Sequence, residues 1–169
     1  MPDDLCVVAI DGGATSGWAV GTFTVADLDS PKDEYKVLKH WAAGVCGGDE
    51  HEMLDELVGL LEVWDDAAVV VERFHLRPGM PTMDDELLSP VRVNAVVDHY
   101  LWDEDRPVYF QNPGDAMSTF PDELLEKWQL WSPSVDARIA TAHLLLFVRR
   151  LRLPKVGKVI RDQMGWPQS

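Results

Sequence analysis

The stretch LCVVAIDGG, residues 5–13, decides the fold of this chain. Its run of apolar residues lacks the alternation of a half-exposed strand, which indicates a strand buried on both faces. Asp11 ends this run, and the two glycines that follow are typical of a tight turn. We therefore expect a central strand at Leu5–Asp11 that presents a carboxylate at its end.

Four further strands are predicted around this one. Residues 16–25 are rich in β-forming side chains and are expected to form a hairpin with the first strand. Residues 37–45 predict a weaker third strand, and residues 67–73 (AAVVVER) predict a fourth that is again buried on both faces. A short fifth strand is predicted at residues 107–111.

Helices are predicted between and after these strands. Apolar residues recur at helical spacing in residues 50–64, with acids on the opposite side. A second helix is predicted at residues 86–101, and Pro90 is expected to delay its start because proline lacks the amide hydrogen that a helix interior uses. A short helix at residues 121–130 and a long one at Val135–Leu151 follow. Loops are expected elsewhere, including residues 27–36, 75–85 and 112–120.

This order of elements predicts an α/β fold. Its mixed five-stranded sheet begins with a β-hairpin, continues with βαβ units and is flanked by helices. We expect one domain at residues 1–153, followed by a basic C-terminal tail at residues 154–169. No apolar run approaches the roughly 18 residues of a membrane span. The acidic start does not resemble a secretory signal, so a cytoplasmic protein is expected. Cys6 and Cys46 predict neither a disulfide nor a zinc site.

The net charge of −14 is unevenly distributed. Residues 137–169 contain seven of the 15 lysines and arginines but only one of the 29 acids. This basic end is either a solvated helix terminus favoured by the helix dipole or a contact for phosphate groups.

Three acids, Asp11, Glu72 and Asp136, stand at the ends of predicted elements within apolar sequence. Taken singly, Asp11 suits a turn, Glu72 can pair with a nearby arginine, and Asp136 suits a helix N-terminus. Taken together, clustered carboxylates repel one another and are relieved by divalent cations. Two such cations about 4 Å apart can activate water and stabilise the leaving oxygen in phosphodiester cleavage. The three acids therefore predict a metal-dependent nuclease.

The segments AIDGGATSGWAV (residues 9–20) and VVVERF (residues 69–74) resemble the first hairpin and the second acidic strand of RuvC-like Holliday junction resolvases, in the ribonuclease H superfamily. Residues 111–131 and Val135–Leu151 are similar to the C-terminal part of phage-encoded members. The resemblance implies a ribonuclease-H-like fold and a DNA endonuclease that resolves branched junctions in recombination and repair. It places the protein in the host cytoplasm if it is phage-encoded. A ribonuclease H activity on RNA–DNA hybrids would use the same metals.

Carried over onto this chain, the resemblance implies that Asp11 bridges two Mg²⁺ or Mn²⁺ ions and that Glu72 and Asp136 complete the ligand set. The family commonly carries another acid three residues further along the last helix, where this chain has Ile139. Pro133, three residues before Asp136, is no ligand either. The departure leaves three carboxylates where the family has four.

Two other side chains are candidates to replace the missing acid. Asp115 lies in the NPGDAM segment, and His143 lies on the same helix face as Asp136. Seven residues of helix separate His143 from Asp136 by roughly 10 Å. A buried, hydrogen-bonded role is therefore favoured for His143 over metal ligation.

Candidate DNA contacts follow from positive charge and from aromatic side chains. Phe74 or His75 could stack on unpaired bases, although a plain surface loop is the alternative for the segment after Glu72. Trp64, Trp128 and Trp131 lie at or near helix ends and are expected to pack in the core or at helix caps. The candidate phosphate contacts are Arg77, Arg138, Arg149, Arg150 and Lys155.

The resemblance also implies a homodimer, because two symmetric cuts need two active sites. The helix expected at residues 86–101 carries an apolar stripe that is either a dimer face or part of the core. Its members are Val93, Val96, Val97, Tyr100 and Leu101, and Trp102 follows.

Two other functions remain open from the sequence. A catalytically degenerate ribonuclease-H-like protein could bind a partner through its acidic surface, which the charge and Ile139 favour. The segment DGGATS (residues 11–16) also resembles the first phosphate-binding turn of actin-like sugar kinases and ATPases. Those proteins need a second such turn, which this sequence lacks after residue 60.

Overall fold

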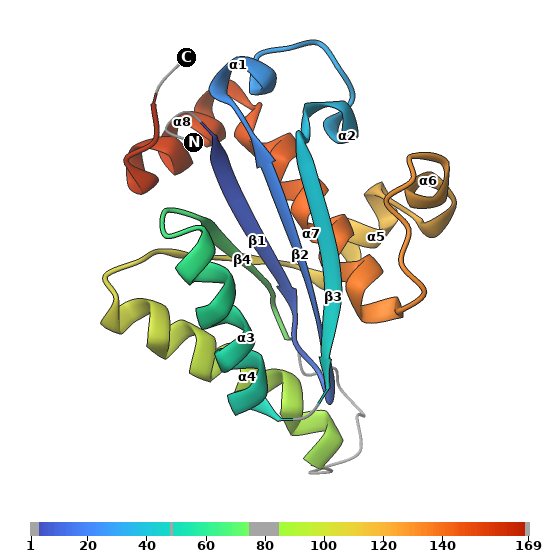
Figure 1. The fold of residues 1–169 in the computed structure, drawn as a ribbon, viewed down its shortest axis with the longest axis vertical. Coiled ribbons are helices and arrows are strands. Elements are labelled where there is room, and N and C mark those ends of the chain that lie inside the picture. The colour runs from blue at the N-terminus through green and yellow to red at the C-terminus, as the bar shows by residue number, and fades with distance from the viewer. Residues whose placement is uncertain (1–3, 48, 75–84, 168–169) are drawn as a thin grey trace.

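The computed structural model describes residues 4–47, 49–74 and 85–167. In this part of the chain, a five-stranded sheet with the strand order β3-β2-β1-β4-β5 has helices on both faces (Figure 1). The predicted mixed α/β fold is confirmed. The strands are β1 (Leu5–Asp11), β2 (Thr15–Phe23), β3 (His40–Gly47), β4 (Ala68–Glu72) and β5 (Val108–Gln111).

The sheet is antiparallel on one side of β1 and parallel on the other. β1 pairs antiparallel with β2, which pairs antiparallel with β3. β4 runs parallel to β1, and β5 runs parallel to β4. The central position of β1 between β2 and β4 explains the unbroken apolar sequence of this strand, which is buried along its whole length.

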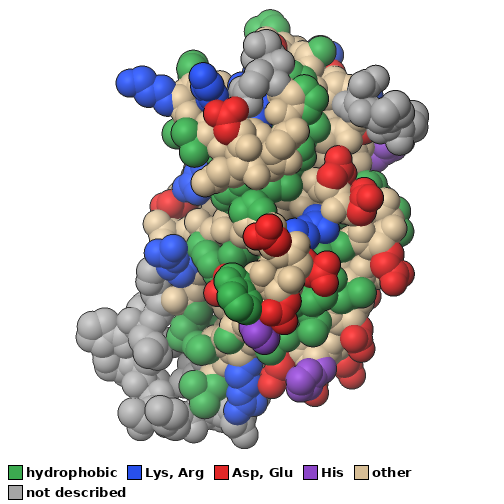
Figure 2. Space-filling view, turned by 90° about the vertical axis from the view of Figure 1, so that its left-hand side faces the viewer, with side chains coloured by type: hydrophobic (Ala, Val, Ile, Leu, Met, Phe, Trp, Pro, Cys, Tyr) green, Lys and Arg blue, Asp and Glu red, His purple; other side chains and the backbone are tan. Residues whose placement is uncertain are grey.

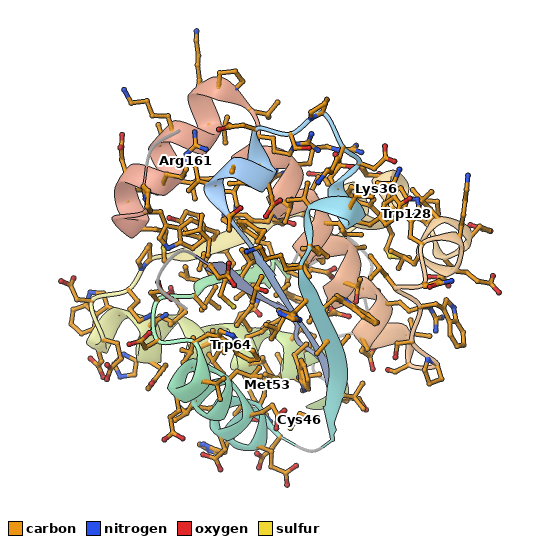
Figure 3. The ribbon with its side chains drawn as sticks, turned by 45° about the horizontal axis from the view of Figure 1, so that its top comes forward. Lys36, Cys46, Met53, Trp64, Trp128 and Arg161 are labelled. Carbon is orange, nitrogen blue, oxygen red and sulfur yellow. The ribbon has the colours of Figure 1, made fainter. Side chains whose placement is uncertain are left out.

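Two layers of helices enclose the sheet. α3 and α4 cover one face, where Met53 of α3 is fully buried against the strands (Figure 3). α7 covers the other face, and its apolar side chains form a second core with β1, β2 and β4. The helices are α1 (Val25–Leu28), α2 (Glu34–Val37), α3 (Glu50–Val63), α4 (Asp85–Asp103), α5 (Pro113–Thr119), α6 (Asp122–Lys127), α7 (Val135–Leu151) and α8 (Pro154–Met164).

Several predicted boundaries differ from the structure. The second strand ends at Phe23, because Thr24 caps α1 and exchanges hydrogen bonds with Asp27. The expected loop at residues 27–36 therefore contains helical turns, and the third strand starts at His40 rather than at residue 37. The expected connection at residues 112–120 contains α5.

Pro90 was expected to delay the second predicted helix, and this expectation is wrong. α4 begins at Asp85, and Pro90 lies inside it. A proline removes one helical hydrogen bond, whereas Val93, Val97 and Leu101 of the same helix are fully buried. Burial of these three side chains outweighs the lost hydrogen bond. The apolar stripe of α4 thus belongs largely to the core.

The basic segment after α7 was expected to be a tail, but it forms α8 and packs against the sheet. Ile160 and Trp166 are only 6% and 5% exposed and belong to the core beneath α7. The ring of Trp166 meets Phe23 edge-on, with 6.4 Å between ring centroids. Gly157 allows α8 to approach α7 closely, because a Cβ there would overlap the carbonyl of Leu151.

Deletion of residues 154–169 is therefore expected to lower the free energy of unfolding by about 3 kcal/mol or more. A fully buried large apolar side chain contributes about 1.5–3 kcal/mol, and the deletion removes both Ile160 and Trp166. Urea denaturation followed by circular dichroism measures the change. Deletion of residues 167–169 alone, which retains Trp166, is the control. Equal midpoints for the intact and the shortened chain would contradict the packing role of α8.

None of the helices in the described part of the chain combines the length and the apolar character that crossing a membrane requires.

Candidate active site

Four residues lie in register across the sheet where β1 and β4 end. Asp11, the last residue of β1, pairs with Gly17 of β2. Glu72, the last residue of β4, pairs with Gln111 of β5. The parallel pairing of β1 with β4 runs up to the residue before each acid. Asp11 and Glu72 therefore end neighbouring strands, which lie about 4.8 Å apart in a sheet.

Both acids point to the side of the sheet that α7 covers. Ile10 and Val71, which precede them, lie in the core beneath α3 and α4. Successive side chains of a strand point to opposite faces, so Asp11 and Glu72 face α7. The two strand-end acids thus share one face and one edge of the sheet.

Asp136 is brought to the same place by the close approach of α7 to β2. A Cβ at Gly17 would lie 2.2 Å from both the carbonyl carbon and the carbonyl oxygen of Asp136. Only glycine leaves room for this contact. Since Gly17 is the register partner of Asp11, the first turn of α7 lies beside the end of β1.

Burial dominates the electrostatics of this cluster. Burial, together with the charges of Glu72 and Asp136, raises the pKa of Asp11 to about 8. Burial also raises the pKa of Asp136, against the opposing effect of Arg138. A cation placed among these carboxylates would attract each of them and so offset the repulsion between them.

The side chain of His143 is fully buried and joins the strand ends to α7. Its Nε2 lies 2.7 Å from Glu72 Oε2, and its Nδ1 lies 2.8 Å from Gln111 Oε1. The buried, hydrogen-bonded role favoured for His143 agrees with these contacts. The contact with Glu72 was not anticipated, because the sequence relates His143 only to Asp136.

The carboxylates of this cluster are ligands that suit a divalent cation, but they do not form a complete metal site before the cation binds. In the part of the chain that the structure describes, no group of three or more histidine, cysteine, aspartate or glutamate side chains is arranged to hold a metal ion. Mg²⁺ is often held by one or two carboxylates, with water and substrate phosphate completing its shell. Asp11 and Glu72 on adjacent strand ends suit this mode, with Asp136 nearby.

Arg138 does not extend into solvent as a free phosphate contact. Its Nε lies 3.0 Å from Asp122 Oδ1, and its Nη1 donates to the carbonyls of Ser132 and Pro133. The side chain is only 12% exposed. Its guanidinium therefore supports the loop that leads into α7. The predicted contact Arg77 lies outside the described residues.

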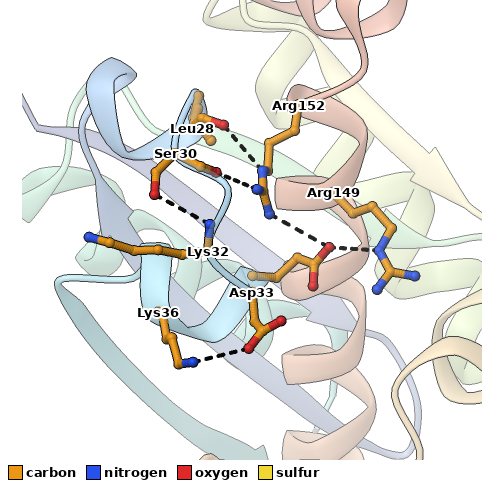
Figure 4. Close-up of polar contacts among 8 residues, drawn as sticks. Leu28, Ser30, Lys32, Asp33, Lys36, Arg149 and Arg152 are labelled. Carbon is orange, nitrogen blue, oxygen red and sulfur yellow. Dashed lines mark hydrogen bonds and ion pairs between the residues drawn. The ribbon is translucent and has the colours of Figure 1, made fainter.

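The arginines at the C-terminal end of α7 are also engaged within the protein. Arg149 Nε donates to Glu34 Oε1 at 2.8 Å, and Arg152 donates to the backbone carbonyls of Leu28, which ends α1, and of Ser30 (Figure 4). Arg150 lies 3.7 Å from Asp115. Asp115 is thus directed towards the end of α7, away from Asp136 at its start.

Lys155 is exposed, but it lies at the far end of the sheet from Asp11. α8 packs by way of Trp166 against Phe23, the register partner of Leu5. β1 separates Leu5 from Asp11 by about 20 Å, at 3.3 Å per residue. Figure 2 shows basic side chains at the upper end of one face, where α8 lies, and below them more acidic side chains with basic ones among them.

Of the three tryptophans expected to pack in the core or at helix caps, Trp131 is the most exposed. Trp128 stacks on Tyr35 at 4.5 Å (its position is labelled in Figure 3), and Trp64 packs against the core beneath α3. Trp131 is 47% exposed and lies over the guanidinium of Arg138 at 5.3 Å. Its place in the loop before α7 leaves it outside the core.

Phe74 lies directly beyond the end of β4. It lines a cavity of about 250 Å³ together with Arg73, Val91, Asn94 and Phe110. The proposed alternative, His75, lies outside the described residues.

Sequence reasoning missed three residues that organise the site: Gly17, Asn94 and Gln111. Asn94 of α4 donates to the backbone carbonyl of Glu72 at 2.9 Å and so fixes the end of β4. Gln111 had an available signal, because it ends the fifth predicted strand as Glu72 ends the fourth. The role of Gly17 depends on the position of α7, which the sequence does not reveal.

No family model matches this sequence, and no curated protein matches it. Among solved structures, a Thermus thermophilus RuvC structure is similar, with a TM-score of 0.61 and 17% identity over 90% of this chain and 97% of that chain. T. thermophilus RuvC in complex with a Holliday junction substrate has a TM-score of 0.62 and 14% identity, over 89% and 96% of the two chains. At these identities the likeness concerns the fold alone: this chain has a ribonuclease-H-like fold that matches RuvC.

Proposed function

We propose that this protein is a metal-dependent endonuclease that cleaves branched DNA. The observation that carries the proposal is the placement of Asp11 and Glu72 on neighbouring strand ends facing α7, with Asp136 close enough to raise the pKa of Asp11. Such charge crowding is typical of functional sites. The ribonuclease-H-like fold and the similarity to RuvC support a nuclease.

Each side chain has a definite part in the proposed reaction. Asp11, Glu72 and Asp136 would hold Mg²⁺ or Mn²⁺, which would supply an activated water and neutralise charge at the phosphate. Attack of this water on phosphorus would break the bond to the 3′ oxygen and leave a 3′ hydroxyl and a 5′ phosphate. Burial of Asp11 limits its exposure to bulk water.

The proposed substrate is a four-way DNA junction, which the sequence resemblance supports, as does the similarity in fold to a RuvC structure that contains a Holliday junction. Resolution of a four-way junction by two symmetric cuts requires two copies of this chain, so we propose a homodimer. Trp102, 74% exposed on α4, is a candidate for its interface because exposed tryptophans often anchor interfaces. A role in recombination or repair, and a phage-type origin, remain predictions from the sequence motifs.

Cleavage of labelled DNA tests the proposal. A four-way junction, a linear duplex and an RNA–DNA hybrid are incubated with the protein in Mg²⁺, Mn²⁺ or EDTA. We expect paired symmetric nicks in the junction that require metal and disappear in Glu72→Gln and Asp136→Asn. Glu123→Gln, an exposed acid on α6, is the matched control and should cleave normally. Cleavage of the hybrid alone would redirect the proposal to a ribonuclease H activity.

A degenerate, partner-binding protein is the second candidate. The lack of a preformed three-ligand group among the described residues and the presence of Ile139 favour it. It predicts no cleavage of any substrate in either metal, and no change in thermal stability when Mn²⁺ is added.

A further inference from the structure

A chain of hydrogen-bonding side chains runs from β5 through α7 to Glu72. Gln111 and Glu72 are register partners on adjacent strands, and His143 of α7 contacts both. The side chain of His143 is 0% exposed, and that of Glu72 is 20% exposed. Glu72 therefore meets solvent on one side and a buried imidazole on the other.

The chemistry of the carboxylate decides how the imidazole is oriented. A carboxylate only accepts hydrogen bonds, so His143 Nε2 donates to Glu72 Oε2. In a neutral ring the other nitrogen, Nδ1, then accepts and needs a donor. Gln111 offers one: its Nε2 is buried and has no hydrogen-bond partner among the described residues. A 180° rotation of the Gln111 amide places this orphaned nitrogen on Nδ1.

We propose that Gln111 and His143 form a relay that holds the carboxylate of Glu72 in one orientation. Gln111 donates to Nδ1 of His143, and Nε2–H of His143 donates to Glu72 Oε2. The second carboxylate oxygen of Glu72 would then ligate a divalent cation. His143 is thus a positioning residue, and the inference rests on the proposed metal-dependent function.

Because His143 and Gln111 are buried, their hydrogen bonds affect the orientation of Glu72 more strongly than a surface hydrogen bond would. Removal of the donor leaves the inner side of the Glu72 carboxylate facing a protein interior that offers it no hydrogen bond, and the Glu72 side chain gains rotational freedom. Hydrogen-bond partners of metal ligands typically contribute 10- to 100-fold to metal affinity. We expect an effect of this size on Mn²⁺ binding.

The tautomer can be measured without any metal. ¹⁵N-labelled histidine in the intact protein reports, by NMR, which ring nitrogen carries hydrogen. We expect hydrogen on Nε2, which contacts Glu72, and an Nδ1 that accepts from Gln111. The signal is assigned by its loss in His143→Gln. Hydrogen on Nδ1 alone, or on both nitrogens, would overturn the relay as proposed.

Calorimetric titration with Mn²⁺ tests its effect on the site. His143→Leu, which removes the donor, should weaken binding 10- to 100-fold, and Gln111→Leu should weaken it by less. His143→Gln, which can donate from the same region, should retain most of the affinity. His99→Leu changes an exposed histidine on α4 and should bind as the wild type does. Thermal melting identifies any variant that fails to fold, and Gln111→Leu carries the test if His143→Leu does so.

The outcomes separate the two proposals. Failure of the wild type to bind Mn²⁺ overturns the proposed function and the relay with it. Wild-type binding that is unchanged in both His143→Leu and Gln111→Leu overturns the relay alone and leaves the metal-dependent function standing.

Discussion

Asp11→Asn is expected to abolish cleavage and, at the same time, to stabilise the metal-free fold. The carboxylate is 9% exposed and lies near Glu72 and Asp136, which contribute to raising its pKa to about 8. Asparagine keeps the shape but removes the buried charge. Loss of a carboxylate that would hold the proposed cations should reduce the cleavage rate at least about 1000-fold, since each 1.4 kcal/mol of lost transition-state stabilisation is a factor of ten.

The stability change depends on pH in a definite direction. The raised pKa of Asp11 means that the folded protein binds a proton that the unfolded chain releases between about pH 4 and pH 8. The free energy of unfolding of the metal-free wild type therefore falls as pH rises through this window. Asp11→Asn lacks this contribution. It should match the wild type near pH 4 and exceed it by a few kcal/mol near pH 8, because each pKa unit corresponds to about 1.4 kcal/mol.

Urea denaturation in EDTA at several pH values measures this effect, beside junction cleavage in Mn²⁺. Asp115→Asn is the matched control, because Asp115 is exposed and pairs with Arg150. It should change neither the cleavage rate nor the pH dependence. If the Asp11→Asn protein cleaves normally, Asp11 is not part of the active site. A variant less stable than the wild type at pH 8 would contradict the buried charge.

Gly17→Ala is expected to damage both the fold and the site. The new Cβ would lie 2.2 Å from the backbone of Asp136, and a helix backbone cannot move aside as a flexible side chain can. Overpacking of a core commonly costs 1–3 kcal/mol. We expect about 3 kcal/mol or more here. Any displacement of α7 also moves Asp136 from Asp11, and a shift of about 1 Å can reduce activity about 100-fold.

Gly47→Ala is the matched control for Gly17→Ala, because a Cβ at Gly47 meets nothing within 4 Å. Both glycines lie in strands, so the two variants share the same change in backbone freedom. Thermal melting and cleavage in saturating Mn²⁺ should separate them clearly. Equal stability of the two variants would mean that α7 does not lie against Gly17.

The strands could be predicted well because local sequence determines them. The apolar runs that end in Asp11 and Glu72 are buried on both faces, and their order along the chain indicated the mixed sheet. The proximity of the two acids followed from the same reasoning, because both end strands. Prediction failed where contacts between residues far apart in the sequence determine the structure. The sequence of α8 is largely polar and basic, yet Ile160 and Trp166 pack this segment against the sheet.

The local environment of the site was less accessible to sequence reasoning. The positive charges after residue 136 suggested phosphate contacts, but Arg138 and Arg149 are bound to internal acceptors. Helical spacing gave the distance between His143 and Asp136 along the helix. It could not predict the contact between His143 and Glu72, because these residues are 71 positions apart in the sequence. Such pairs depend on the assembled sheet and helix, which no local pattern contains.

The place of α7 and α8 also affects how this protein acquires its fold during synthesis. β1 is made early, but one face of it is covered by residues 135–166, which the ribosome makes much later. At about 5–20 residues per second, the nascent chain spends roughly ten seconds with that apolar face uncovered. The sheet core is therefore completed only after α7 and α8 have been synthesised. Truncated or stalled chains that end before α7 should be ready clients for chaperones and proteases.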